Sequence, residues 1–173
     1  MRFQRVTSRE DPGFERAMAL YAVSFPLHEQ RLPDSQCRIL GLEAYHLEQI
    51  MEGDRFLGAL FFWETDTFIY VEHFCMEPDL RGQGLGQKAL ALLGERGKTV
   101  ILEIDPPVDE ISQRRKGFYL RCGFRENPCR HVHPAYRPAY QGHELEVMSC
   151  PGKLEQGDYD DFFAYLRDTV MGI

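Results

Sequence analysis

A chain of 173 residues is long enough for one sizeable hydrophobic core, and we expect a single domain over residues 1–173. The composition, 43% hydrophobic and 27% charged, is typical of a soluble globular protein and excludes a disordered or fibrous one. The net charge of -7 argues against a general nucleic-acid binder, and no apolar run approaches the roughly 20 residues that span a bilayer. We therefore expect a cytoplasmic protein with no nucleic-acid or membrane partner.

The first half of the chain predicts one strand, two helices and then a group of strands. Residues 3–7 alternate weakly, and large apolar residues recur at helical spacing over 13–25. Asp34 can cap a short helix that runs to about residue 40. Segments rich in aromatic and β-branched residues then predict three strands at 44–51, 55–63 and 67–76. The short connections between these strands favour an antiparallel meander.

The second half predicts alternating helices and strands. A helix over about 84–96 leads into a short apolar strand at 99–104, and this order with short links makes strands 67–76 and 99–104 parallel. The remaining predicted elements are a helix around Ile111 to Cys122, strands at 124–132 and 144–149, and a final helix around Tyr159 to Val170. The pattern indicates an α/β (α+β) fold, in which a mixed central sheet of about seven strands is flanked by helices.

Three glycines stand within five positions where the helix at 84–96 should begin, in the stretch Arg81-Gly82-Gln83-Gly84-Leu85-Gly86. Glycine at a helix start costs about 0.5 to 1 kcal/mol relative to alanine, so the segment should have a use. Without Cβ atoms, the backbone N–H groups of residues 82–87 can converge on one anion, with the helix dipole and Arg81 in support. A diphosphate fits this description. Neither the dinucleotide nor the Walker spacing is present.

The glycine segment resembles the Arg/Gln-x-x-Gly-x-Gly/Ala signature of the GCN5-related N-acetyltransferases (GNAT), whose loop binds the pyrophosphate of acetyl-CoA. The stretch Gly117-Phe118-Tyr119-Leu120-Arg121-Cys122-Gly123-Phe124 is similar to the family's second signature, a helix with a tyrosine followed by Gly-Phe. The order and spacing of elements agree from about residue 3 to 149. The resemblance implies an acetyl-CoA-dependent N-acetyltransferase, with acetyl-CoA as cosubstrate and no metal, that acts by direct attack of a primary amine of a small molecule or peptide.

The resemblance also implies which residues hold the coenzyme. Ser112 stands where the family often has an asparagine at the pantetheine arm, and Arg115 replaces a small residue. The N–H of Met76 corresponds to the oxyanion donor. The implied coenzyme-binding residues are Phe74, Cys75, Met76, Arg81, Gly82, Gln83, Gly84, Leu85, Gly86, Gln87, Ser112 and Tyr119. The basic residues between 113 and 131 are either the solvated face of a helix or the neighbourhood of the coenzyme phosphates.

Three residues are candidates for the chemistry. An alkyl amine with a pKa near 10.4 is neutral about once in a thousand at pH 7, so a base is worth about 4 kcal/mol. Glu72 lies on the strand at 67–76, on the face of Tyr70 and Phe74 by the two-residue period, and Glu103 lies near the end of the next strand. Either carboxylate can serve as the base. Tyr119 is the candidate proton donor to the coenzyme thiolate, at the position of the family's motif tyrosine.

Other functions stay open from the sequence. A non-catalytic acyl-CoA-binding regulatory module would keep the glycine loop without the chemistry. A ping-pong enzyme would need Cys75 as nucleophile, but no base is next to it in the sequence. His131 and His133 share a strand face, yet no second ligand pair has zinc spacing, which favours a substrate-pocket or surface role. Tyr136 and Tyr140 are expected to shape the acceptor pocket, and the oligomeric state is open between monomer and homodimer.

Overall fold

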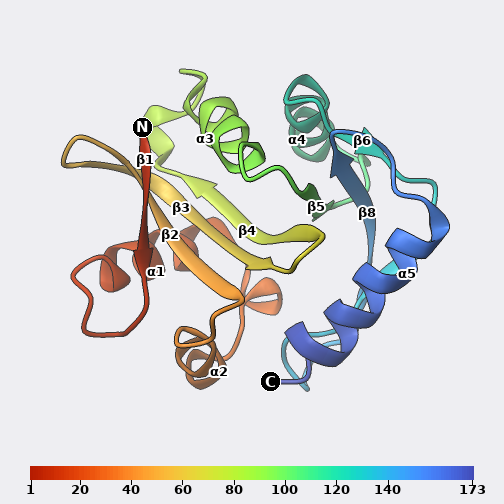
Figure 1. The fold of residues 1–173 in the computed structure, drawn as a ribbon, viewed down its shortest axis with the longest axis horizontal. Helices are drawn as coiled ribbons and strands as arrows, with labels where there is room; N and C mark the ends of the chain where they lie inside the picture. The colour runs from red at the N-terminus through yellow and green to blue at the C-terminus, as the bar shows by residue number, and fades with distance from the viewer.

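The computed structural model describes all 173 residues and contains eight strands and five α-helices. Strands β2 to β4 form the expected antiparallel meander, and β1 pairs antiparallel with β2. Strands β4 and β5 are parallel, so the sheet is mixed as the sequence predicts. The sheet order is β1-β2-β3-β4-β5-β8-β6, and β7 pairs with β8 (Figure 1). The strands are β1 (Arg2–Val6), β2 (Tyr45–Glu52), β3 (Arg55–Glu64), β4 (Phe68–Met76), β5 (Thr99–Ile104), β6 (Arg125–Glu126), β7 (His131–His133) and β8 (His143–Cys150). The helices are α1 (Phe14–Ser24), α2 (Pro33–Ile39), α3 (Leu85–Gly94), α4 (Glu110–Arg121) and α5 (Gln156–Tyr165).

The sheet has eight strands where the sequence predicts about seven, because the single strand expected at 124–132 is wrong. Two short strands, β6 and β7, occupy that region. Pro128 lies between them and has no N–H to donate to a ladder. The side chain of Asn127 instead donates to the Val147 carbonyl at 3.2 Å and to Ser149 Oγ at 2.9 Å. The break leaves β7 free to pair with the first residues of β8.

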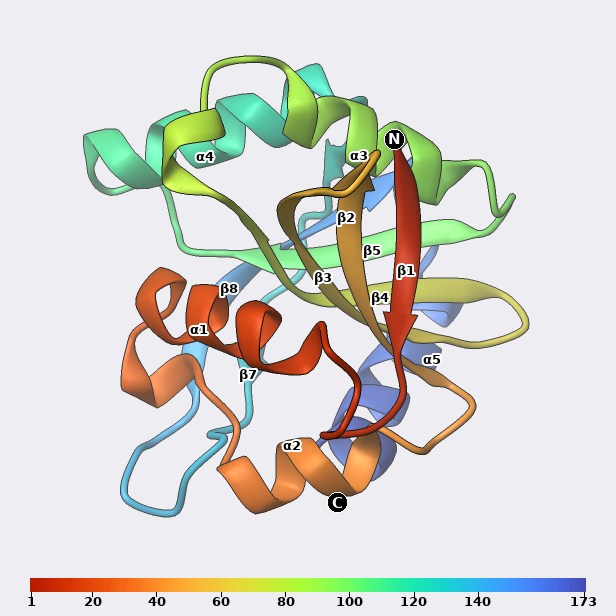
Figure 2. The same ribbon diagram turned by 90° about the vertical axis from the view of Figure 1, so that its left-hand side faces the viewer.

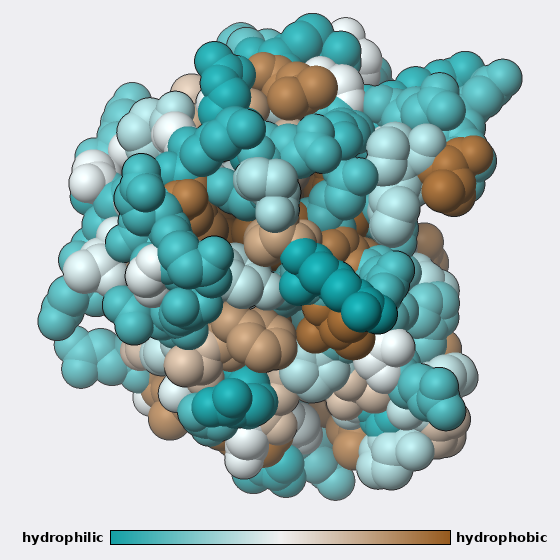
Figure 3. Space-filling model, turned by 90° about the vertical axis from the view of Figure 1, so that its right-hand side faces the viewer, coloured by the Kyte–Doolittle hydropathy of each residue, from teal (hydrophilic) through white to brown (hydrophobic).

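Helices cover both faces of the sheet and enclose two hydrophobic clusters (Figure 2). One cluster lies between the sheet and helices α1, α2 and α5, with Tyr21, Trp63 and Phe162 at its centre. The other packs beneath α3 and α4 and includes Leu93 and Tyr119. The outer face that carries α5 and β8 is mainly hydrophilic, with apolar side chains in small separate groups (Figure 3). None of the helices combines the length and the apolar character that crossing a bilayer requires.

Strands β4 and β5 pair only over their first four residues, and the separation beyond these residues opens the centre of the molecule. The parallel register runs from Phe68 opposite Thr99 to Val71 opposite Leu102. Beyond these residues β4 continues to Met76 and β5 to Ile104 without pairing to each other. The gap between the two unpaired ends is the position around which the candidate site is built.

Candidate active site

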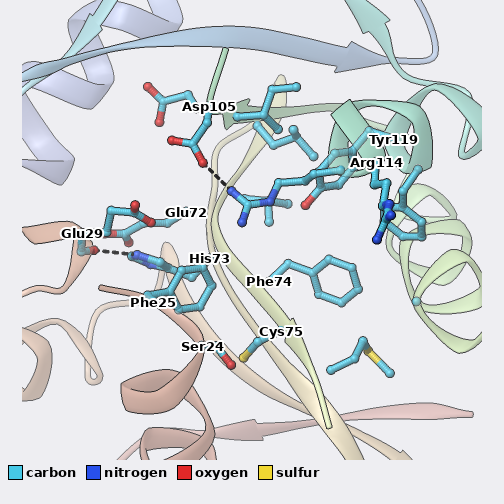
Figure 4. Close-up of a pocket in the computed structure, with 18 of the residues that line it drawn as sticks. Ser24, Phe25, Glu29, Glu72, His73, Phe74, Cys75, Asp105, Arg114 and Tyr119 are labelled. Carbon is cyan, nitrogen blue, oxygen red and sulfur yellow. Dashed lines mark hydrogen bonds and ion pairs between the residues drawn. The ribbon is translucent and has the colours of Figure 1, made fainter. Parts of the chain in front are cut away.

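A cleft of about 980 Å³ begins at the gap between β4 and β5 and extends to the start of α3. Its walls come from both strands, from α3 and α4, from the end of α1, and from the segment around β7 (Figure 4). Glu72, Glu103 and Tyr119 all line it, so the structure brings the three candidate catalytic residues to one cavity.

One end of the cleft is formed by residues 81–87, which we call the glycine loop. Gly82 and Gly84 have φ angles of +78° and +73°, in the left-handed region that favours glycine. A Cβ at either position would meet no atom within 4 Å, so backbone conformation rather than space requires these glycines. Gly84 is the N-cap of α3, so the loop leads directly into the N-terminal N–H groups of that helix.

Most of the residues implied in coenzyme binding line the cleft, but two do not. Gln83 turns away and donates to the Asp79 carbonyl at 3.2 Å. Ser112 sits in a capping box at the start of α4, where its Oγ accepts from the N–H of Asp109 at 3.1 Å and its own N–H donates to the Asp109 carboxylate at 2.8 Å. The residues that do line it are Phe74, Cys75, Met76, Arg81, Gly82, Gly84, Leu85, Gly86, Gln87 and Tyr119.

A β-bulge in β4 changes which side chains share a face. Phe61 of β3 is opposite His73, but the next residue, Phe62, is opposite Val71, so Glu72 is the extra residue. The prediction that Glu72 shares a face with both Tyr70 and Phe74 is therefore wrong. Tyr70 belongs to the core beneath α1 and α5, whereas Phe74 packs against the opposite core. Figure 4 shows Glu72 and His73 on one side of the strand and Phe74 on the other.

Glu72 is bound through both carboxylate oxygens. Arg31 Nε donates to Oε1 at 2.7 Å, and Trp63 Nε1 donates to Oε2 at 2.9 Å. The Glu72 side chain is 1% exposed and that of Arg31 is 3% exposed. Burial raises the pKa of Glu72, but Arg31, His73 and the Trp63 hydrogen bond outweigh burial and hold the pKa below its usual value. Glu72 is thus a paired carboxylate at neutral pH.

Glu103 lies at the centre of a second group of buried polar side chains. Tyr70 donates its hydroxyl to Glu103 Oε2, and His131 Nε2 bonds to Oε1. On its other side, His131 Nδ1 lies 2.9 Å from the hydroxyl of Tyr159 on α5. Burial raises the pKa of Glu103, but His133, His131 and the Tyr70 hydrogen bond hold it below its usual value. We call Arg31, Tyr70, Glu72, Glu103, His131 and His133 the buried network.

The two groups with a reactive hydrogen near the glycine loop are both protonated at neutral pH. Tyr119 lines the cleft with no hydrogen-bond partner in the protein, and burial raises its pKa to about 12. Burial likewise raises the pKa of the Cys75 thiol to about 12. The Cys75 sulfur lies 3.8 Å from the Ala59 carbonyl, and Ser24 is beside it in the cleft (Figure 4). Thiolate formation at Cys75 is therefore strongly disfavoured.

Several residues of the site carry no recognisable sequence signal. Arg31 lies in an irregular segment between α1 and α2, and only the fold shows that it meets Glu72. His73 donates from Nε2 to the Glu29 carbonyl, 2.9 Å away, and burial lowers its pKa to about 4. Tyr136 lines the cleft as the sequence predicts, but Tyr140 does not. The sequence identifies Glu72 and Glu103 as charged residues within largely apolar strands, but it does not identify their partners.

Comparison with known proteins identifies relatives of one kind. The family model of the acetyltransferase (GNAT) domain matches residues 44–126. A solved structure from Bacteroides thetaiotaomicron, provisionally assigned as a GNAT-family acetyltransferase, has a TM-score of 0.92 at 30% identity, over 100% of this chain and 99% of that chain. A protein of Bacillus subtilis (strain 168), provisionally assigned as acetyltransferase YjbC, is 42% identical over 69 residues, 38% of this chain and 35% of that protein. The match thus spans about a third of that relative.

A more distant solved structure shares the fold alone. It is a Bacillus subtilis acetyltransferase in complex with CoA, with a TM-score of 0.57 at 14% identity. The alignment covers 86% of this chain and 96% of that chain.

Proposed function

The chain belongs to the GNAT family of acetyltransferases, and from that premise we propose that it transfers the acetyl group of acetyl-CoA to a primary amine of a small molecule or peptide by direct attack. The observation that carries the proposal is the continuous cleft, which joins the glycine loop to the buried network. One end offers backbone N–H groups at a helix N-terminus, and the other offers carboxylates and imidazoles. These are the groups that a diphosphate and an ammonium ion respectively require.

The glycine loop is the proposed site for the pyrophosphate. Arg81 and Arg121 both line the cleft, and neither forms an ion pair within the protein. Their guanidinium groups are therefore available for phosphate oxygens. Arg115, by contrast, is held by Asp105 at 2.6 Å. Arg114 and Lys116 of α4 are also ion-paired, so Arg121 is the basic residue of this helix that is free for the coenzyme.

The state of Cys75 supports the proposal that no covalent enzyme intermediate forms. A thiol with a pKa of about 12 is almost wholly protonated at pH 7 and is a poor nucleophile. The acceptor amine is then the group that attacks the thioester carbon. The ladder of β3 and β4 supports Met76 as the oxyanion donor. Glu77 N donates to the Leu57 carbonyl at 2.9 Å, so the alternation of an antiparallel pair turns the N–H of Met76 away from β3.

Tyr119 is the proposed donor to the leaving sulfur. Its phenol stays protonated at neutral pH, and no protein group competes for its hydrogen. Because a phenol with a pKa of about 12 is a weaker acid than a thiol with a pKa near 8.5, it stabilises the departing thiolate mainly by donating a hydrogen bond.

Of the two carboxylates, Glu103 is the better candidate to assist removal of the ammonium proton. Both oxygens of Glu72 are bound to donors of other residues, and its charge is matched by Arg31. Glu72 is therefore assigned to holding the segment around Arg31 against β4. The side chains beside Glu103 are the Tyr70 hydroxyl and the imidazoles of His131 and His133, and no arginine or lysine pairs with it. Its negative charge therefore remains available to stabilise a cation in the cleft.

The test is a screen of acetyl-CoA against polyamines, aminoglycosides and lysine-bearing or amino-terminal peptides. Thiol release and the mass of the acetylated product are measured together. We expect acetyl transfer to at least one class of amine, abolished when that amine is methylated to a quaternary ammonium ion. Tight binding of acetyl-CoA by calorimetry, with no acetylated product from any amine, would favour a non-catalytic acyl-CoA-binding module and contradict the proposal.

A further inference from the structure

Two buried side-chain polar atoms in the protein have no hydrogen-bond partner, and the residues of both line the cleft. They are Ser24 Oγ and His133 Nε2. An unpaired buried polar group costs about 1–3 kcal/mol, so native proteins seldom retain one without a use. His133 is the more informative of the two, because it is 2% exposed and stands beside the charged carboxylate of Glu103.

The hydrogen bonds of His131 and His133 show which ring nitrogen of each histidine carries a proton, and the nitrogen differs between the two. His131 Nε2 bonds to the Glu103 carboxylate, which only accepts, so His131 must donate from Nε2. His133 Nδ1 lies 2.5 Å from the Pro134 carbonyl, which also only accepts, so His133 donates from Nδ1. In the neutral ring, Nε2 of His133 therefore carries a free lone pair. That atom lies 3.8 Å from Glu103 Oε2, beyond hydrogen-bond distance.

We propose that His133 is the general base of the acetyl transfer, and that Tyr70, Glu103 and His131 are positioning residues that place a negative charge beside it. The proposal rests on the proposed function, since it names the proton acceptor of that same reaction. The arrangement gives His133 what a base requires, namely a lone pair at the cleft wall, a fixed tautomer and an anion that stabilises the protonated ring.

The other basic groups of the cleft are less suited to this role. The carboxylates Glu72 and Glu103 are bound through both oxygens, and the partners of each hold its pKa below the usual value. His73 has a pKa lowered to about 4 by burial, which makes it a weak base. An imidazole is the side chain whose ordinary proton affinity lies nearest to neutral pH. The titratable groups facing His133 are Glu103 on β5, His73 on β4, Glu29 on the turn after α1, His143 on β8 and Tyr136 on its own loop.

The proton balance of the step is complete with these residues. The acceptor ammonium gives one proton to His133 Nε2, directly or through one water, and the imidazolium is balanced by Glu103. The neutral amine forms the C–N bond to the thioester carbon, and the C–S bond breaks. The second nitrogen proton neutralises the departing thiolate, whose sulfur also accepts the hydrogen bond from Tyr119. His133 then returns its proton to solvent, so the products are the amide, CoA thiol and one proton.

The variant His133→Asn tests the role, because asparagine can keep a donor near the Pro134 carbonyl while Nε2 is lost. We expect kcat/KM at pH 7 to fall by about 10²- to 10⁴-fold, with the loss shrinking as pH rises toward the pKa of the amine. The probe is acetyl-CoA with spermidine and with a lysine-bearing peptide. His46→Gln is the matched control, since the His46 side chain is likewise shielded from solvent, at 11% exposed, but lies on β2, bonded to Glu48 at 3.2 Å. The control should stay within twofold of wild type.

Affinity for acetyl-CoA, measured by calorimetry, separates a lost base from a lost fold and should change less than twofold in His133→Asn. An unchanged kcat/KM with an unchanged acid limb of the pH profile would overturn the proposal. If wild type acetylates neither probe, the proposed function fails for these amines. Long-range ¹H–¹⁵N spectra then still test which nitrogen of the His133 ring carries the proton. The neutral ring should carry its proton on Nδ1; a proton on Nε2 would overturn the assignment.

Discussion

The two ends of the cleft are built in different ways. The glycine loop is main chain whose shape is set by Gly82 and Gly84, and its one charged side chain, Arg81, is unpaired. The buried network consists of charged and polar side chains that are almost wholly excluded from solvent and, apart from His133, are hydrogen-bonded to other members of the network. The first end is formed by the seven consecutive residues 81–87, whereas the second draws on β4, β5, β7 and the segment before α2.

The contrast between the glycine loop and the buried network indicates which residues determine coenzyme binding and which determine stability and turnover. A glycine-rich loop can bind a diphosphate through backbone N–H groups, which every residue except proline has. Its binding therefore depends on the backbone conformation that the glycines allow. A buried charge is tolerated only when it is paired and hydrogen-bonded, so each member of the buried network depends on its partners. Changes at the loop should weaken coenzyme binding and leave the fold intact, while changes in the network should act on stability or turnover.

The largest effect on stability is expected from Glu72→Gln. Removing this charge leaves Arg31 buried without its anion, which costs about 3–5 kcal/mol of unfolding free energy. The matched control is Glu110→Gln, which removes an ion pair with Arg114 whose side chains are 85% and 79% exposed. The control should cost less than about 0.5 kcal/mol. Urea unfolding measures both, and a loss below 1 kcal/mol for Glu72→Gln would show that the pair is not essential.

Acid stability should reveal the burial of His73. Its folded pKa of about 4 lies below the usual histidine pKa of 6.5, so the unfolded chain binds the proton more readily. Its contribution to stability is present above pH 6.5 and is lost as pH falls from 6.5 to 4. The difference of 2.5 pKa units corresponds to about 3 kcal/mol at 1.36 kcal/mol per unit. In His73→Phe this part of the slope should disappear, and the same slope in the variant and wild type would contradict the assignment.

A smaller effect is expected from Tyr119→Phe, which tests the loop side of the chemistry. Loss of a hydrogen bond to a charged sulfur should lower kcat/KM by about 10- to 100-fold. Affinity for acetyl-CoA should stay near that of wild type, because the phenol acts on the leaving thiolate. The comparison of kcat/KM with the calorimetric affinity decides the role. Unchanged turnover would remove Tyr119 from the reaction.

The parts of the structure that sequence predicts are those with a local signal. The glycine loop is a contiguous motif, and the strand at 99–104 agrees residue for residue with β5 because apolar residues and flanking breakers mark it. The pair of Arg31 and Glu72 is separated by 41 positions, and that of His131 and Glu103 by 28, so no window of sequence contains either. The β4 bulge inserts one residue without a sequence mark, which is why the face of Phe74 is mispredicted.

The central claim is that the glycine loop binds the coenzyme while the buried network supports turnover. It is tested by measuring both acetyl-CoA affinity and kcat/KM in one variant of each end. In Gly84→Val a side chain must adopt a φ of +73°, and we expect affinity to fall by about 10- to 100-fold, with Gly94→Ala as a neutral control. In Glu103→Gln we expect affinity within twofold of wild type but kcat/KM at least about 100-fold lower. An unchanged acetyl-CoA affinity in Gly84→Val would contradict this claim. So would a Glu103→Gln variant that loses acetyl-CoA affinity but keeps normal turnover per bound coenzyme.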